Sequence, residues 1–266
     1  MQTKQPVNAG PSSSFDRHVY AVQRYVEFTS SRYAALMTPG VVTHPICCFG
    51  KTESAEVVTI GLNPSIGEFE ESRWPKALKH SALAERCANY FAKDGRPPSH
   101  PWFAPWTKAL GHIGYDFENG SAVHLDLSPR ATRYVSALKE AYEQALFLEM
   151  VERDLWVSFA TLDLCQNAKL VLIAGTVTGK FYINEFLQRL APDYGWSLDG
   201  AFDRAKHPGK GKTQRHCLSN HHRRLPVFFC SSSPSDSRNL ELLPRRVQEN
   251  EEALKQAVRS PVKWMQ

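Results

Sequence analysis

Four short apolar segments, separated by stretches of helical periodicity, constrain the fold of this chain more than any other feature. The four segments are residues 57–60, 122–125, 170–174 and 225–229. Short apolar runs bounded by turn residues are typical of buried strands. Apolar residues recur at helical spacing in residues 15–37, 76–92, 104–112, 131–156, 179–190 and 244–258. Strands that alternate with helices predict an α/β fold, and we expect a three-layer α/β/α sandwich around a central, mostly parallel four-stranded sheet.

The length and apolar content of the chain predict one domain. Its 266 residues, 42% of them hydrophobic, are enough to bury one large core. Residues 1–14 hold almost nothing that can be buried, so we expect a disordered tail there and a single domain over 15–266. No segment approaches the roughly 20 apolar residues of a membrane helix, and the N-terminus lacks the features of a signal peptide. We expect a cytoplasmic, monomeric protein without membrane contact.

The six cysteines are scattered without a Cys-x-x-Cys pair, which argues against a disulfide framework or an iron–sulfur site. We expect buried free thiols and no cofactor. Residues 204–224 also hold several histidines and a cysteine, but their spacing fits no common zinc site, and we expect no metal.

Positive charge is concentrated in residues 204–224. The net charge of +5 decides little by itself, but this segment has seven basic residues and no Asp or Glu. Such a segment is either a solvated loop or a contact surface for a polyanion, whose affinity would fall with added salt. The basic residues are Arg204, Lys206, Lys210, Lys212, Arg215, Arg223 and Arg224.

Two loops at the ends of predicted strands contain residues suited to chemistry. The loop Gly61-Leu62-Asn63-Pro64-Ser65 follows the first strand, and the Ser- and Pro-rich residues 231–239 follow the last. Ligands of doubly wound α/β folds bind beyond the carboxyl ends of the strands. Asn63 offers one acceptor and two donors there. Either loop alone would also be explained by turn formation.

Together these loops resemble the two motifs of the uracil-DNA glycosylase superfamily, over about residues 55–255. The Gly-x-Asn-Pro form of the first motif is intact in residues 61–64. The second, usually His-Pro-Ser or Asn-Pro-Ser, is altered, because Ser233 precedes Pro234 and Ser235. The resemblance implies a monofunctional DNA glycosylase that flips a base out of single- or double-stranded DNA, hydrolyses its N-glycosidic bond and leaves an abasic site.

The resemblance also implies roles for individual residues. Asn63 would hold the attacking water and Ser233 would donate to the leaving base. Phe69 would stack on that base, with Trp74 as the alternative. The residues implied or expected to contact DNA are Ser235, Arg238, Asn239, Lys210, Lys212, Arg215, Arg223 and Arg224.

Asp126 and Ser65 bear on which base is excised. Asp126 stands where the family often has an Asn that recognises the base edge. A carboxylate accepts from the N4 amino group of cytosine and opposes O4 of uracil. Ser65 replaces an aromatic residue that blocks C5 in family members that reject thymine. The predicted substrate is therefore a 5-substituted cytosine, hydroxymethylated or glucosylated, as in some phage DNA, and a role in anti-phage defence is implied.

Several alternatives stay open at this point. The alternative substrate is uracil, a mismatched pyrimidine or a deaminated purine, as in base excision repair. Asp126 would serve as a helix cap in a purely structural interpretation. A nucleic-acid-binding module without activity, or a small-molecule nucleosidase, would also account for parts of the pattern.

Overall fold

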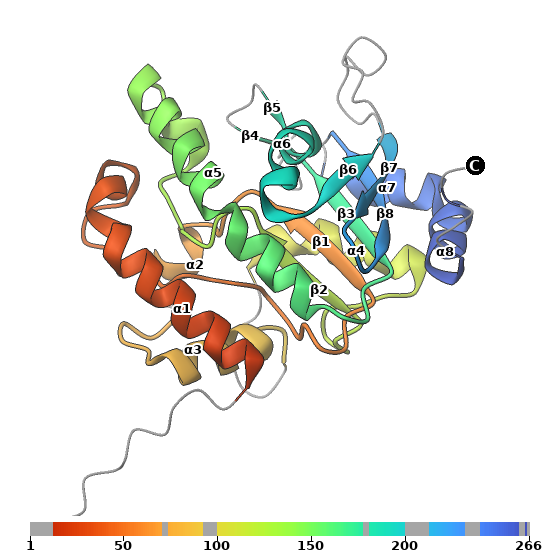
Figure 1. The fold of residues 1–266 in the computed structure, drawn as a ribbon, viewed down its shortest axis with the longest axis horizontal. Helices are drawn as coiled ribbons and strands as arrows, with labels where there is room; N and C mark the ends of the chain where they lie inside the picture. Colours follow the sequence, from red (N-terminus) through yellow and green to blue (C-terminus); the bar gives the residue numbers. More distant parts are fainter. Residues whose placement is uncertain are drawn as a thin grey trace, which may run out of the picture.

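A six-stranded sheet forms the centre of the molecule (Figure 1). The computed structural model describes residues 13–70, 74–92, 100–177, 181–199, 213–231, 240–260 and 264. The strand order is β2-β1-β3-β8-β7-β6. The strands span Ala122–Asp126 (β2), Val57–Gly61 (β1), Leu170–Ala174 (β3), Arg224–Cys230 (β8), Thr213–Ser219 (β7) and Ser197–Asp199 (β6).

The four predicted strands are confirmed, and they are the parallel ones. β2, β1, β3 and β8 pair in parallel. β7 pairs antiparallel with β8, and β6 pairs antiparallel with β7. The prediction of four strands was therefore wrong by two. β7 was not predicted because its sequence, Thr-Gln-Arg-His-Cys-Leu-Ser, is mostly polar. β6 was not predicted because it has only three residues. Pairing with β8, rather than an apolar run, places β7 in the sheet.

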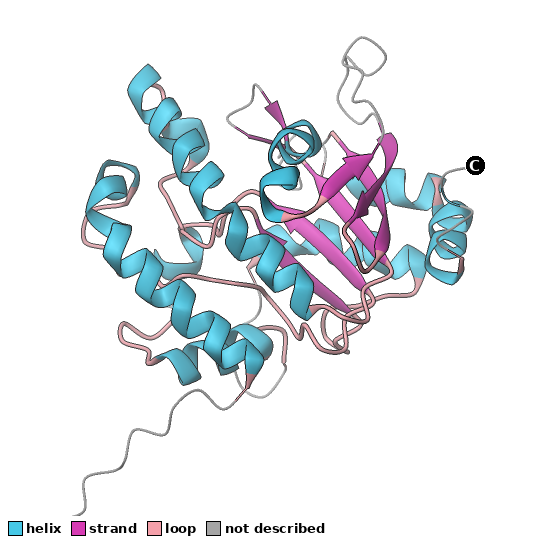
Figure 2. Cartoon of the chain, in the orientation of Figure 1, coloured by secondary structure: helices cyan, strands magenta, loops and turns pink. Residues whose placement is uncertain are grey.

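Helices lie on both sides of this sheet (Figure 2). α5 contacts β2 and α1, while α4 packs on α7 and α8, and α8 contacts β3 and β8. The helices are α1 (Ser14–Thr29), α2 (Gly67–Glu70), α3 (His80–Ala88), α4 (Ala104–Ile113), α5 (Ala141–Leu164), α6 (Ile183–Leu190), α7 (Leu242–Glu249) and α8 (Glu251–Arg259). Short 3₁₀ helices span Ser30–Leu36, Pro101–Phe103, Val135–Ala137 and Ala191–Tyr194. Two further short strands, β4 (Thr176–Val177) and β5 (Phe181–Tyr182), pair antiparallel.

Three of the differences from the predicted helices have a local reason. α1 begins at Ser14 because Ser13 and Asp16 form a capping box, so residues 13 and 14 are structured rather than part of a tail. α5 begins ten residues later than predicted, at a second capping box between Glu140 and Glu143. The predicted helix 244–258 is two helices, α7 and α8, which meet at the non-helical Asn250.

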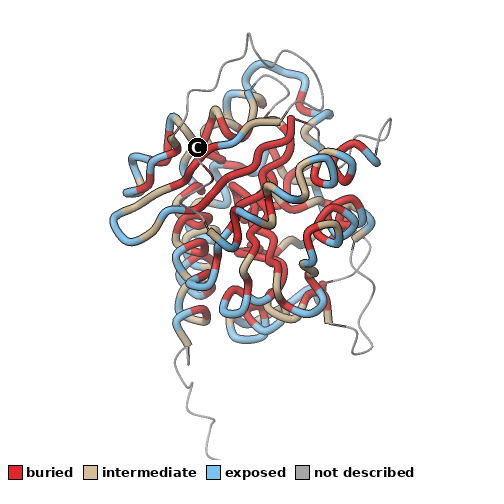
Figure 3. The backbone as a smooth tube through the Cα atoms, turned by 90° about the vertical axis from the view of Figure 1, so that its right-hand side faces the viewer, coloured by how far each residue is buried: buried red, intermediate tan, exposed pale blue. Residues whose placement is uncertain are grey.

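The parallel strands form the middle of the hydrophobic core. Every residue of β1, β2 and β3 is buried. Figure 3 shows that buried backbone gathers at the centre of the molecule. All six cysteines are free and buried, as expected. No helix among the described residues is long and apolar enough to cross a membrane. Because β1, β2, β3 and β8 run in parallel, the loops that leave their carboxyl ends share one edge of the sheet.

Candidate functional site

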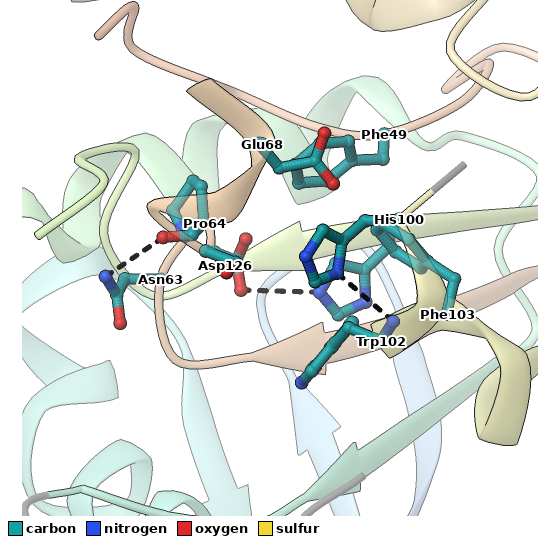
Figure 4. Close-up of a pocket in the computed structure, with 10 residues that line it drawn as sticks. Phe49, Asn63, Pro64, Glu68, His100, Trp102, Phe103 and Asp126 are labelled. Carbon is teal, nitrogen blue, oxygen red and sulfur yellow. Dashed lines mark hydrogen bonds and ion pairs between the residues drawn. The ribbon is translucent and has the colours of Figure 1, made fainter. Parts of the chain in front are cut away.

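A small pocket lies at the carboxyl ends of β1 and β2 (Figure 4). It is lined by Phe49, Asn63, Pro64, Ser65, Glu68, His100, Trp102, Phe103, His124 and Asp126. Three predicted site residues thus line it: Asn63 and Ser65 from the loop after β1, and Asp126 from the end of β2. The register of β1 and β2, which sets Gly61 opposite Asp126, brings these loops together. The pocket encloses about 30 Å³, which is enough for bound water. A nucleobase would enter only after the lining side chains move.

Asn63 is held so that its carboxamide oxygen stays available. Its Nδ2 donates to the carbonyl oxygens of Pro64 and Arg130 and to Oγ1 of Thr132, each at 3.2 Å. Its Oδ1 accepts no hydrogen bond from any described residue. Because the three contacts to Nδ2 fix the orientation of the amide, Oδ1 is the atom that can accept a hydrogen bond from a water molecule.

A buried ion pair supports the loop that holds Asn63. Arg130 Nε lies 3.0 Å from Asp154 Oδ2, which also accepts from Ser128 Oγ at 2.6 Å. Burial raises the pKa of the Asp154 carboxyl, and the positive charge of Arg130 opposes that rise. The carbonyl of Arg130 is one of the acceptors for Asn63. The ion pair therefore fixes the backbone that orients the carboxamide.

Asp126 forms a buried pair with a histidine two residues earlier on β2. Its Oδ1 lies 3.3 Å from His124 Nε2, and His124 Nδ1 lies 2.7 Å from Thr59 Oγ1 on β1. The side chains of His124 and Asp126 are 1% and 4% exposed. Asp126 lines the pocket, and its side-chain oxygen Oδ1 contacts His124 rather than a backbone N–H at the start of a helix.

The absence of a side chain at Gly61 makes room for the contact between His124 and Asp126. A Cβ atom at Gly61 would lie 2.6 Å from Asp126 Oδ1 and 2.9 Å from His124 Nε2. Both distances are below any ordinary contact of a methyl group. The glycine of the first motif is thus required by packing, in addition to any turn that it permits.

Glu68 is a second carboxylate in the pocket that the sequence analysis missed. It lies on α2 and is 1% exposed. Tyr90 donates its hydroxyl to Oε1 at 2.6 Å, and Trp74 Nε1 lies 3.4 Å from Oε2. An acidic residue five positions after Asn63 is visible in the sequence, but nothing there distinguishes it from a solvated one. Its burial follows from the tertiary contacts with Trp74 and Tyr90.

His100 was also missed, and it presents a nitrogen donor. Its Nδ1 accepts the backbone N–H of Trp102 at 3.1 Å (Figure 4). In the neutral ring the proton therefore resides on Nε2. A Cβ at Gly67 would come within 2.9 Å of that Nε2, so a glycine is needed beside the ring.

Aromatic rings form one wall of the pocket, but Phe69 is not among them. The wall consists of Phe49, Trp102 and Phe103. Phe49 is attached to β2 by two backbone hydrogen bonds with His124, at 2.8 and 2.9 Å. Phe69 is buried beside Trp74 with ring centroids 6.0 Å apart, and neither ring lines the pocket. Phe49 therefore lines the pocket, whereas the predicted Phe69 does not.

The predicted DNA contacts fall into two groups. Ser233, the predicted donor, and Ser235, Arg238, Asn239, Lys210 and Lys212 lie outside the described residues. Of the remaining three arginines, Arg215 is exposed on β7, with its guanidinium 5.0 Å from the centre of the Trp264 ring. It pairs with Phe228 in the half of β8 nearer the carboxyl edge.

Arg223 and Arg224 lie at the end of β8 that is remote from the pocket. They lie at the amino end of β8, about 20 Å along the strand from its carboxyl end. Arg223 donates to the carbonyl oxygens of Leu162 and Cys165 at the end of α5. Arg224 lies 3.6 Å from Asp199. Arg223 is therefore a structural residue, and neither side chain shares a surface with the pocket.

The described residues contain no group of three or more His, Cys, Asp and Glu side chains that could hold a metal ion. The pocket is instead a set of hydrogen-bonding groups surrounded by aromatic rings. No model of a known protein family matches the chain, and no curated protein sequence matches it significantly. The function is therefore inferred from the geometry of the pocket.

Proposed function

We propose that this protein is a DNA glycosylase of the uracil-DNA glycosylase type that excises a 5-substituted cytosine. The observation that carries the proposal is the meeting of Asn63 and Asp126 in one enclosed pocket at the carboxyl ends of adjacent parallel strands. One side chain is suited to holding water and the other to recognising a base edge. Both are needed for selective hydrolysis of an N-glycosidic bond.

Asn63 would position the attacking water at the sugar. The bond between C1′ and the base nitrogen breaks, its electron pair goes to the base, and the water oxygen bonds to C1′. The water loses one proton and the departing base gains one, which leaves a neutral base and an abasic sugar. A carboxamide oxygen orients water but is a far weaker base than a carboxylate. Positioning and activation of the leaving group would therefore supply most of the rate enhancement.

Asp126 and Ser65 would select the base. A carboxylate accepts a hydrogen bond from the N4 amino group of cytosine and is repelled by O4 of uracil. Ser65 is half-buried, and its Oγ accepts the backbone N–H of Gly67 at 3.2 Å, so it presents a small side chain to the pocket. Phe49 and Trp102 supply aromatic surface for a flat ring. Space beside C5 is what a hydroxymethyl or glucosyl substituent requires.

The test is base release from defined oligonucleotides. Each carries one cytosine, 5-hydroxymethylcytosine, glucosylated 5-hydroxymethylcytosine, uracil, mismatched thymine or hypoxanthine, and alkali cleaves the abasic product. Cleavage at a 5-substituted cytosine supports the proposal, and Asn63→Ala should then lower the single-turnover rate at least 100-fold. Asn167→Ala, on the surface before the amino end of β3, is the matched control and should match the parent. Absence of cleavage at every base contradicts the proposal.

A further inference from the structure

Beneath the pocket, a chain of three buried side chains leads from β1 to Asp126. Thr59 and His124 are directly opposite each other in the register of β1 and β2, and both are fully buried. Thr59 Oγ1 lies 2.7 Å from His124 Nδ1, and His124 Nε2 lies 3.3 Å from Asp126 Oδ1. Trp102 and Phe103 pack edge-on against the imidazole, at 4.9 and 5.4 Å between ring centroids. The ring therefore has no room to turn away from this arrangement.

The distances decide where the imidazole proton lies. The Thr59 hydroxyl has one proton and two nearby acceptors: His124 Nδ1 at 2.7 Å and the Val123 carbonyl oxygen at 3.3 Å. The shorter contact is the usual length for an O–H donor, so the hydroxyl donates to Nδ1. A neutral His124 then carries its proton on Nε2, which faces Asp126 Oδ1. In this arrangement Nε2 donates to Asp126 Oδ1, so Oδ1 serves as a hydrogen-bond acceptor.

The opposite arrangement would give the pocket a different chemistry. If Thr59 donated to Val123, Nδ1 of His124 would carry the proton and Nε2 would present a lone pair. Asp126 would then have to be protonated to satisfy that lone pair, and its carboxyl group would be neutral. The two other titratable groups facing this pocket are Glu68 on α2 and His100 before α4.

We propose that Thr59 and His124 are positioning residues that hold Asp126 as a hydrogen-bond acceptor, so that the pocket selects a base edge with an amino donor. The proposal rests on the proposed function for the identity of the ligand. The direction of the hydrogen bonds from Thr59 to His124 and from His124 to Asp126 does not depend on catalysis. Thr59 fixes the tautomer, His124 donates to one carboxylate oxygen, and the other oxygen remains for the ligand.

Two substitutions at Thr59 separate this role from a merely structural one. Thr59→Val removes the hydroxyl but keeps the shape and the β-branching that suit a strand. Thr59→Ser keeps the hydroxyl and should restore the parental behaviour. In ¹⁵N NMR spectra the parent should show His124 with a protonated Nε2 and an unprotonated, hydrogen-bonded Nδ1. In Thr59→Val the Nδ1 resonance should move to that of a nitrogen without a donor. A protonated Nδ1 in the parent overturns the proposal.

The second readout is selectivity in binding, measured without turnover. Oligonucleotides carry 2′-fluoro-arabino cytidine or 2′-fluoro-arabino uridine, whose glycosidic bonds resist cleavage, and Kd is measured for each. The parent should prefer the cytosine edge, and Thr59→Val should reduce that preference about fivefold to tenfold, the effect of one lost hydrogen bond. Thr59→Ser should retain it. No preference in the parent, or equal preference in both variants, overturns the proposal. A parent that prefers cytosine but releases no base disproves only the glycosylase activity.

Discussion

Replacing Gly61 by alanine should destabilise the protein through one methyl group placed against the buried pair. The added Cβ would lie 2.6 Å from Asp126 Oδ1, 2.9 Å from His124 Nε2 and 3.0 Å from His124 Cε1. The imidazole is packed against Trp102, so Asp126 has to turn away and the contact with His124 is lost. Overpacking of this kind costs about 1–3 kcal/mol, and loss of the buried contact places the expected effect in the upper half of that range.

Urea denaturation measures this effect, with Gly111→Ala as the matched control. Gly111 is exposed in α4, and a Cβ there meets nothing within 4 Å. An alanine in this helix should raise the free energy of unfolding by about 0.5–1 kcal/mol. With a slope of about 3 kcal/mol per molar, Gly61→Ala should lower the urea midpoint by somewhat less than 1 M. A midpoint for Gly61→Ala equal to the parent, while Gly111→Ala rises, would refute the packing argument.

Three further predictions concern groups outside the pocket. Arg223→Met should lower the free energy of unfolding by about 2 kcal/mol, because α5 loses two hydrogen bonds at its end. The same substitution should leave the salt dependence of DNA binding unchanged. A weaker salt dependence in the variant would instead support a direct contact between Arg223 and DNA. Asp154→Ala should cost about 3–5 kcal/mol in the same assay, since it leaves Arg130 buried without its partner, and a loss below 1 kcal/mol would argue against the ion pair. Burial lowers the pKa of His18 from 6.5 to about 4, so the free energy of unfolding should fall as the pH drops from 6.5 to 4, by about 3 kcal/mol at most. His18→Gln should make this fall smaller. An unchanged pH profile of urea midpoints in the variant would contradict the assigned role of His18.

The sequence predicted those parts of the fold that have a local signal. The parallel strands are continuous apolar runs, and burial on both faces requires such runs. β7 has no such run. Its place in the sheet depends on hydrogen bonds to β8, which its own sequence does not reveal. The break at Asn250 between α7 and α8 was missed for a similar reason, since the periodicity of 244–258 continues through it.

The site was predictable where it follows the strand ends. Asn63 and Asp126 both leave carboxyl ends of strands that turned out to be neighbours, so their meeting follows from the topology. Glu68 and His100 were not predictable, because both depend on tertiary contacts with Tyr90, which lies 22 residues from Glu68 and 10 residues from His100. The contacts of Arg223 with the end of α5 were not predictable either, because a run of basic residues does not indicate which end of a β-hairpin each one occupies.

The most direct test of the account is a single-turnover assay of base release from DNA containing one glucosylated or hydroxymethylated cytosine. The account predicts an abasic site at that position, loss of at least 100-fold in rate for Asn63→Ala, and a shift of preference toward uracil for Asp126→Asn. Intact DNA with the parent protein, or equal cleavage by the parent and Asn63→Ala, would contradict the claim that this pocket hydrolyses a glycosidic bond.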